Sequence, residues 1–179
     1  MKKISSIHSL TLTSIGAAMI AALSQISFSV GPIPFTLQTF AIGLIATIFR
    51  FREAVGSVLL YILLGACGLP VFSGHGGIAV LQGPSAGFIW GFVVYVLVTS
   101  SLTNSKTSKI QVFLANLLGD AMVFLLGIAW LVFMAKMEWS AALAVGLYPF
   151  IITDLIKIFF ITIFSQLIFA SLKGNSYFK

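Results

Sequence analysis

Long runs of apolar residues, separated by short polar segments or by proline and glycine, make up almost the whole chain. An α-helix needs about 20 such residues to cross the hydrocarbon core of a bilayer. The pattern therefore predicts an all-α, polytopic membrane protein of six transmembrane helices, forming a single domain over residues 1–179. The predicted spans are about 10–30, 35–49, 54–69, 84–100, 110–134 and 148–170, with outer lid loops at 31–34 and 70–83.

The last apolar stretch, residues 141–170, is longer than one crossing requires. As a continuous helix it would extend about 45 Å, against a hydrocarbon core of about 30 Å. Pro149 lies within it, and proline is accepted in the first turn of a helix but disrupts the interior. The final helix is therefore expected to begin near Pro149 or to kink there.

The basic residues predict an orientation. If the N-terminus is inside and the chain crosses six times, eight of the ten basic residues are cytoplasmic, Lys136 is outside and Lys157 lies within a span. Cytoplasmic loops of membrane proteins carry such an excess of positive charge, so both termini are predicted to be cytoplasmic. The eight are Lys2, Lys3, Arg50, Arg52, Lys106, Lys109, Lys173 and Lys179.

Composition excludes several other classes of protein. Hydrophobic residues make up 59% of the chain and charged residues 8%, whereas a soluble domain carries about 25% charged residues. The topology explains the net charge of +6, so nucleic acid is not expected as a partner. The start resembles a signal peptide but has no clear cleavage site, so the first helix is expected to be retained.

Asp154 and Lys157 are charged residues inside the last predicted span. Their three-residue spacing places them on one face of a helix, and a charge at the membrane centre costs about 2.5–3.5 kcal/mol on insertion scales. A carboxylate supplies acceptors and an ammonium supplies donors. The pair therefore suits a solute with an acid and an amide-like or ureido group, and the alternative is a structural ion pair.

Asp120 and Asn116 lie one turn apart in the fifth predicted span. Asp120 is about 15 Å from the inner end of its helix, a depth that Lys157 can share. Lys157 can then pair with Asp154, or with Asp120 so that Asp154 is left for a ligand. A structural role is favoured for Asp120, and Asn116 is a candidate ligand-binding residue.

Three polar residues near the outer ends of the helices are further candidates for ligand contacts. His75 lies in a loop whose glycines allow close folding over a ligand. Gln38 follows a Gly-Pro-x-Pro turn, and Gln82 lies at the end of the outer loop. Each has an alternative role, as a solvated loop residue or as the partner of a backbone carbonyl that proline leaves free.

The chain contains no evident catalytic set. Two distant histidines and the single cysteine, Cys67, give no metal cluster, and a phosphate-binding loop is absent. Neither a metal nor a cofactor is expected, and any ATP must be hydrolysed by another chain. An intramembrane enzyme that uses Asp120 and Asp154 remains an alternative, as does a purely structural membrane subunit.

The first predicted helix carries a cluster of small residues, which allow helices to approach closely in a membrane. Such a face indicates a helix–helix contact, within the chain or with a partner. The cluster consists of Ala17, Ala18, Ala21 and Ala22, after Gly16.

Four segments, in order along the chain, together resemble the signatures of the BioY family. These proteins are the biotin-specific substrate-binding subunits (S components) of energy-coupling factor (ECF) transporters. The segments are GPIPFTLQT (31–39), LLYILLGACGLPVF (59–72), GPSAGF (83–88) and YPFIITDLIK (148–157). One departure is Ile152-Thr153, where the family pattern often has Pro-Gly before the acidic residue.

The resemblance implies a six-helix protein of a prokaryotic plasma membrane that captures biotin from outside. It implies a pocket that contains Asp154 and Lys157 and is covered by the first and third outer loops. It also implies that the first-helix alanines dock on a transmembrane coupling subunit, and that two cytosolic ABC-type ATPases drive uptake. An S component for a different vitamin is the alternative within this class.

Overall fold

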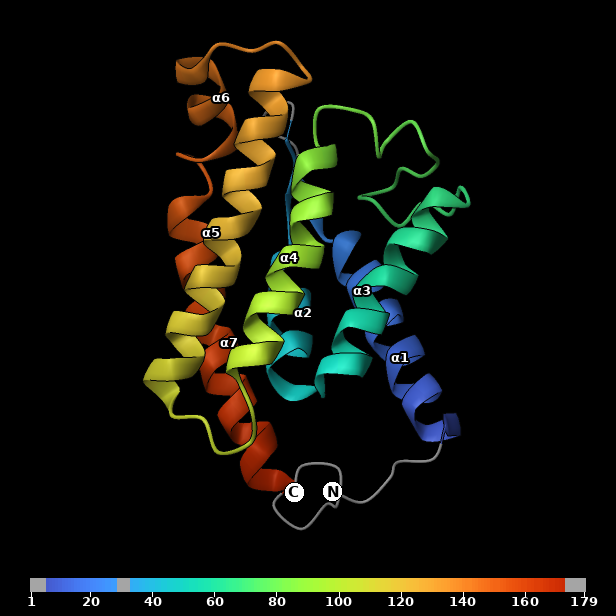
Figure 1. Ribbon diagram of the computed structural model, residues 1–179, viewed down its shortest axis with the longest axis vertical. Coiled ribbons are helices and arrows are strands. Elements are labelled where there is room, and N and C mark those ends of the chain that lie inside the picture. The colour runs from blue at the N-terminus through green and yellow to red at the C-terminus, as the bar shows by residue number, and fades with distance from the viewer. Residues whose placement is uncertain (1–5, 29–32, 173–179) are drawn as a thin grey trace.

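The computed structural model describes residues 6–28 and 33–172, and within these ranges the chain is largely helical (Figure 1). Most of the helices run along the long axis of the molecule. In chain order the elements are α1 (Ser6–Ser24), β1 (Ser27–Phe28), β2 (Phe35–Thr36), α2 (Gln38–Ile48), α3 (Phe51–Ala66), α4 (Ala86–Leu102), α5 (Lys109–Phe133), α6 (Trp139–Gly146) and α7 (Ile151–Ser171).

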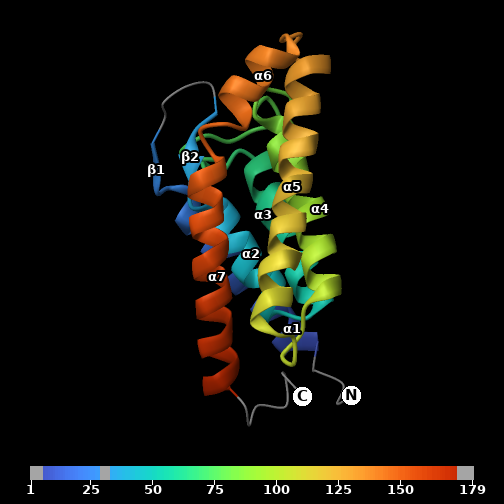
Figure 2. The same ribbon diagram turned by 90° about the vertical axis from the view of Figure 1, so that its left-hand side faces the viewer.

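Helix α2 is the centre of the bundle. It contacts α1, α3, α4, α5 and α7, while α1 packs along α3 and α4 packs along α5. Figures 1 and 2 show α2 enclosed by these longer helices. Its residues 41–47 are all buried, so α2 has almost no surface left for lipid.

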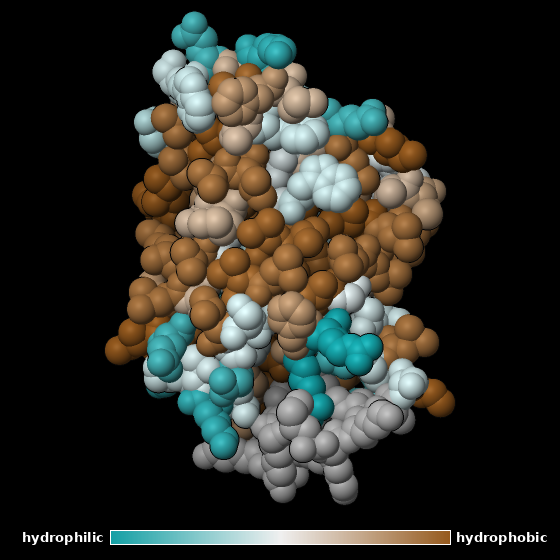
Figure 3. All heavy atoms as spheres, in the orientation of Figure 1, coloured by the Kyte–Doolittle hydropathy of each residue, from teal (hydrophilic) through white to brown (hydrophobic). Residues whose placement is uncertain are grey.

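The outside of the bundle is apolar along most of its length. Three helices, α1, α5 and α7, are long and apolar enough to cross a membrane, and α2 and α4 are shorter apolar helices. Leu125 on α5 and Phe159 on α7 are more than half exposed. Figure 3 shows the apolar side chains as a broad band, with hydrophilic residues at the two ends. This distribution is that of a membrane protein, since large apolar patches are rare on soluble monomers.

The described chain is mostly helical, as predicted, but the first predicted span extends too far. Helix α1 ends at Ser24 and α2 begins only at Gln38, because Ser27 pairs with Thr36 and Phe28 with Phe35 in a short antiparallel sheet. The Phe28 and Phe35 rings stack with centroids 5.1 Å apart. Of the predicted lid loop 31–34, residues 31 and 32 lie outside the described residues.

The other helices begin and end within three residues of the predicted spans, except near the last one. There the chain forms the additional short helix α6 and turns at 147–150 before α7 begins. Helix α7 starts two residues after Pro149, where the missing N–H of proline does no harm.

Glycines allow α4 and α5 to pack closely. A Cβ added at Gly91 of α4 would lie 2.9 Å from the Cα of Val123. Added Cβ atoms at Gly119 and Gly127 of α5 would overlap side chains of α4. Small residues at such positions let helix backbones approach in a membrane, where van der Waals packing drives association.

We expect Gly91→Ala to destabilise the protein by about 1–3 kcal/mol, the usual cost of overpacking a tight contact, because the new methyl group meets backbone that cannot rotate away. Thermal unfolding of the purified protein in detergent measures the effect. Gly83→Ala is the control, since its added Cβ meets nothing closer than 3.4 Å. Equal melting temperatures for the two variants would contradict the prediction.

Candidate ligand-binding cavity

A cavity of about 340 Å³ lies next to the residues before α2 and the α3–α4 loop, and its volume is within the size range of small-molecule sites. Five segments that are far apart in the sequence surround it: residues 33–39, the α3–α4 loop, α4, α5 and the start of α7. The lining residues are Ile33, Pro34, Thr36, Gln38, Thr39, Phe72, Ser73, His75, Val80, Gly83, Pro84, Ser85, Phe88, Ile89, Phe92, Val123, Phe124, Phe150, Asp154 and Lys157.

The short length of α2 explains the position of the cavity. Its 11 residues extend about 16 Å, roughly half of a bilayer's hydrocarbon core. The preceding residues are not helical, and Ile33, Pro34 and Thr36 line the cavity. Non-helical backbone at membrane depth is tolerated where it is buried in protein or lines a cavity.

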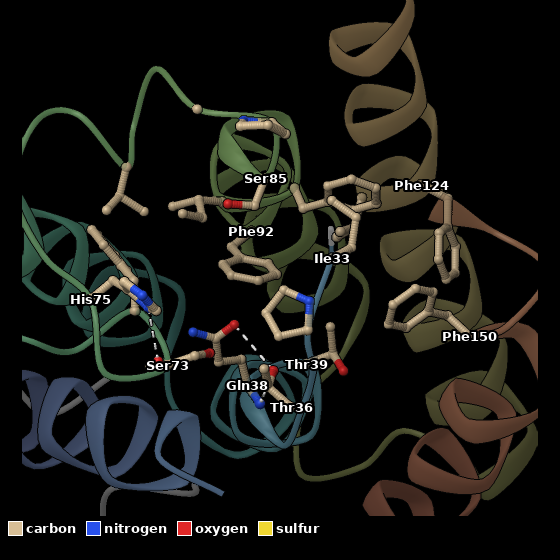
Figure 4. A pocket seen from close by; sticks show the side chains of 18 of the residues that line it. Ile33, Thr36, Gln38, Thr39, Ser73, His75, Ser85, Phe92, Phe124 and Phe150 are labelled. Atoms are coloured by element: carbon tan, nitrogen blue, oxygen red, sulfur yellow. Dashed lines mark hydrogen bonds between the residues drawn. The ribbon is translucent and has the colours of Figure 1, made fainter. Parts of the chain in front are cut away.

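Phenylalanine side chains form the apolar wall of the cavity. Phe72, Phe88, Phe92, Phe124 and Phe150 all line it, and Figure 4 shows Phe124 and Phe150 together on the side opposite His75. The Phe150 ring stacks on Phe35 with centroids 4.3 Å apart. The two-stranded sheet therefore supports this wall from behind.

Asp154, Lys157 and Thr39 form a polar corner of the cavity. Lys157 Nζ lies 2.5 Å from Asp154 Oδ1 and donates to Thr39 Oγ1 at 3.0 Å. The Asp154 side chain is 6% exposed and that of Lys157 14% exposed. Asp154 lies in the first turn of α7, where the positive end of the helix dipole favours a negative charge. The corner thus presents acceptors and donors side by side, and the ion pair and the helix dipole reduce the free-energy cost of burying the charges.

Gln38 is held in a fixed orientation at the start of α2. Its Nε2 donates to the hydroxyl of Tyr61 at 2.6 Å, and its Oε1 accepts from Thr36 Oγ1 at 3.1 Å. Figure 4 shows the second of these bonds at the floor of the cavity. Buried amides require such partners, and they leave the Gln38 carboxamide at the cavity surface.

A tight turn brings His75 to the cavity. Phe72 and His75 exchange two backbone hydrogen bonds, at 2.9 and 3.0 Å. Between them Ser73 and Gly74 have φ values of 52° and 84°, a left-handed conformation that glycine adopts without strain. His75 Nδ1 lies 3.1 Å from the carbonyl oxygen of Ser73, and Figure 4 shows the ring at the edge of the cavity.

Four of the six predicted ligand-binding residues line this one cavity: Asp154, Lys157, Gln38 and His75. Their contact with a ligand stays a prediction. Gln82 is exposed and does not line the cavity.

Asn116 also lies outside the lining. It is fully buried and joins three helices, accepting from the hydroxyl of Tyr95 at 3.0 Å and donating to Thr47 Oγ1 at 3.0 Å. Its position along α5 indicated a membrane-embedded polar group. It lies about two turns before Val123, which lines the cavity, so the two residues share a helix face and differ in depth along α5. The sequence does not specify how deep the cavity extends.

Asp120 on α5 is buried within electrostatic range of Asp154 and Lys157. Of the two arrangements that the sequence left open, Lys157 pairs with Asp154. Within residues 6–28 and 33–172, no group of three His, Cys, Asp or Glu side chains is arranged to hold a metal ion.

Thr39, Ser73 and Ser85 line the cavity but were not predicted to do so. Thr39 directly follows Gln38, yet its role depends on α2 facing α7, which no local pattern reveals. The lining phenylalanines could not be predicted either, because the chain has 17 phenylalanines and apolar side chains also fill cores.

The small residues of α1 divide between two faces. Ala17 is 1% exposed and belongs to the core of the bundle, so its predicted contact with a partner is wrong. Ala21 is half-buried against the same core. Ala18 and Ala22, four residues apart, are exposed. Docking on a partner stays a prediction, and these two exposed alanines are the residues that could make that contact.

Comparison with known proteins identifies the family. The model of the BioY family matches residues 1–174. The chain belongs to the BioY family. It is 42% identical to the biotin transporter BioY2 of Lactococcus lactis subsp. cremoris, with 96% of each chain covered. It is 37% identical to the biotin transporter BioY of Thermotoga maritima, with 79% of this chain and 83% of that protein covered.

A crystal structure of the S component for biotin from an ECF-type ABC transporter has the same fold. It matches with a TM-score of 0.84 over 100% of both chains, at 24% identity. All four segments that resemble BioY signatures meet at the cavity: residues 33–39 of the first, Phe72 of the second, 83–88 of the third and 150–157 of the fourth. The family's sequence pattern and the cavity thus coincide.

We expect Asp154→Asn and Lys157→Met each to destabilise the protein by about 3 kcal/mol, because removing one partner leaves the other as an uncompensated buried charge. The double variant should recover most of that loss, since neither charge remains. Thermal unfolding of the four proteins in one detergent gives the coupling energy. Additive losses would show that the two groups do not stabilise one another.

Proposed function

We propose that this chain is the substrate-binding S component of an ECF-type importer and that it captures biotin from outside the cell. The biotin transporter BioY2 of Lactococcus lactis matches 96% of this chain's length. The observation that carries the proposal is the buried Asp154–Lys157 pair, which opens onto a cavity of ligand size instead of being sealed within the bundle.

The chemistry of the cavity suits the parts of biotin. The ureido ring offers N–H donors for the Asp154 carboxylate and a carbonyl acceptor for donors such as Gln38. The Lys157 ammonium can donate to a carbonyl or to the carboxylate of the side chain. The sulfur-containing ring and the aliphatic chain are apolar, and they match the phenylalanine wall. Small-molecule sites commonly combine an apolar lining with a few placed polar groups.

The described basic residues support an orientation with the cavity outside. The α2–α3 connection with Arg50 and the α4–α5 connection with Lys106 lie at one end of the bundle, whereas Lys136 lies at the end that carries α6 (Figure 1). The positive-inside rule places the first end in the cytoplasm. The proposed topology has six crossings, with both termini cytoplasmic, in the plasma membrane of a prokaryote.

The proposed partners are a transmembrane coupling subunit and two cytosolic ABC-type ATPases. Helix α1 is the proposed contact with the coupling subunit, because Ala18 and Ala22 form an exposed small-residue face. Energy from ATP would enter through the ATPases, since this chain carries no phosphate-binding loop.

The arrangement of charges favours binding over catalysis. An intramembrane enzyme with two catalytic carboxylates would need Asp120 and Asp154 at one water-accessible site. Asp154 is instead held by Lys157, and Asp120 does not line the cavity. A binding site needs only fixed donors and acceptors, which the polar corner provides.

We expect purified protein to bind biotin tightly and Lys157→Met to weaken binding by at least about 100-fold. The variant leaves Asp154 as an unpaired charge beside the ligand, and truncating one partner of a buried hydrogen-bonded charge pair costs about 2–5 kcal/mol. Isothermal titration calorimetry measures both affinities. Lys136→Met is the matched control, because Lys136 is exposed at the outer end and does not line the cavity.

Equal affinities of the two lysine variants for biotin would show that the polar corner does not contribute to binding. If wild-type protein does not bind biotin but binds another vitamin, the ligand assignment is wrong and the assignment as a substrate-binding subunit stands. If the protein binds no vitamin, the proposed substrate-binding function is wrong.

We expect the single native cysteine to report the orientation. Cys67 is exposed at the end of α3 that faces the α3–α4 loop, so a membrane-impermeant maleimide should label it on intact cells. Lys106→Cys in a Cys67→Ser background should react only after permeabilisation, because the α4–α5 connection is proposed to be cytoplasmic. The reverse pattern would invert the proposed topology.

A further inference from the structure

The hydroxyl of Tyr61 connects the cavity to the outer loop that covers it. Tyr61, on α3, is fully buried. Its hydroxyl accepts from Gln38 Nε2 at 2.6 Å and donates to the carbonyl oxygen of Val71 at 3.0 Å. Gln38 lines the cavity, and Val71 directly precedes Phe72 and Ser73, which also line it.

The same carbonyl is bound to the end of α1. Ser24 is fully buried as the last residue of α1. Its Oγ lies 2.5 Å from the Val71 oxygen and 2.6 Å from the Ala21 carbonyl oxygen, so its single proton is donated to one of these two acceptors. Gln25 Nε2 lies 2.8 Å from Ser24 Oγ and 3.0 Å from the carbonyl oxygen of Pro70. Residues 70–71 are therefore tied to α1 on one side and to Tyr61 on the other.

The ring of Tyr61 makes a second, separate contact with this loop. It meets the Phe72 ring edge-on, with centroids 5.4 Å apart. Phe72 lies against Gly65 of α3, where any added Cβ would overlap the ring. A change from tyrosine to phenylalanine therefore removes the hydroxyl link while the packing of Phe72 remains.

We propose that Tyr61 is a positioning residue that couples occupancy of the cavity to the outer end of α1, through the chain Gln38–Tyr61–Val71–Ser24. A ligand that draws the Gln38 carboxamide toward itself takes a donor from the Tyr61 hydroxyl. The hydroxyl keeps its bond to the Val71 carbonyl but loses its buried donor, which costs free energy, so Tyr61 and the Val71 carbonyl adjust together. The carbonyl then shifts the hydroxyl of Ser24.

The coupling would act on the exposed surface of α1. Ala22 is exposed two residues before Ser24, and Ala18 lies one turn further back. A change at Ser24 thus alters the end of the surface that α1 presents to its surroundings. The inference rests on the proposed function, because its ligand is biotin.

The test places a spin label on α1 and reads its mobility by electron paramagnetic resonance. The parent is full-length protein with Cys67→Ser and Ala22→Cys, measured with and without saturating biotin. We expect biotin to change the spectrum of the parent, and Tyr61→Phe to lose most of that change while binding biotin within about tenfold of the parent affinity, as for one lost neutral hydrogen bond.

Ser24→Ala breaks the chain at its other end without touching the cavity. It should likewise lose the spectral change, with an affinity within about twofold of the parent. Tyr95→Phe is the matched control, because it removes another fully buried tyrosine hydroxyl, bound to Asn116, that has no contact with the loop. It should keep the spectral change.

The coupling is overturned if Tyr61→Phe and Ser24→Ala keep the full spectral change, or if Tyr95→Phe loses it equally. It is also overturned if the parent binds biotin by calorimetry but shows no spectral change. Failure of the parent to bind biotin in calorimetry is a separate result, which overturns the proposed function and the coupling with it. If Tyr61→Phe fails to fold, Ser24→Ala decides the question.

Discussion

Charged side chains in an apolar bundle are stable only when other groups satisfy them, and the contact between Asp154 and Lys157 meets this requirement. Three features share the cost of burying these charges: the ion pair itself, the hydroxyl of Thr39 and the N-terminal position of Asp154 on α7. The cavity beside the pair leaves further hydrogen-bonding capacity open. The same residues therefore stabilise the bundle and prepare a site for a polar guest.

The position of the cavity follows from the way backbone polar groups are satisfied in a membrane. Only helices and closed sheets satisfy their own backbone, so a loop at membrane depth must be enclosed by protein. Helix α2 is short and is surrounded by other helices. The residues that precede it are not helical, so their backbone polar groups must be enclosed by protein. The cavity forms where the surrounding helices continue outward beyond the start of α2.

The helices of this protein are largely predictable from its sequence, whereas the contacts between distant segments are not. Apolar runs and prolines located α3, α4, α5 and α7 closely, because lipid exposure and the missing proline N–H act locally. The sheet at Phe28 and Phe35 and the short helix α6 were missed, since both depend on contacts between distant residues. Asp154, Lys157, Gln38 and His75 converge as expected, but Asn116 is buried among α2, α4 and α5 outside the cavity, because the sequence does not give the depth to which the cavity extends.

The stack of Phe28, Phe35 and Phe150 connects the two-stranded sheet to the wall of the cavity. Phe28 covers Phe35, and Phe35 covers the outer side of a wall residue of the cavity. Lifting this loop away would wet three aromatic faces at once, and the hydrophobic effect opposes that exposure. The stack therefore holds Phe35 against the wall of the cavity, and any change that separates the three rings must expose apolar surface to water.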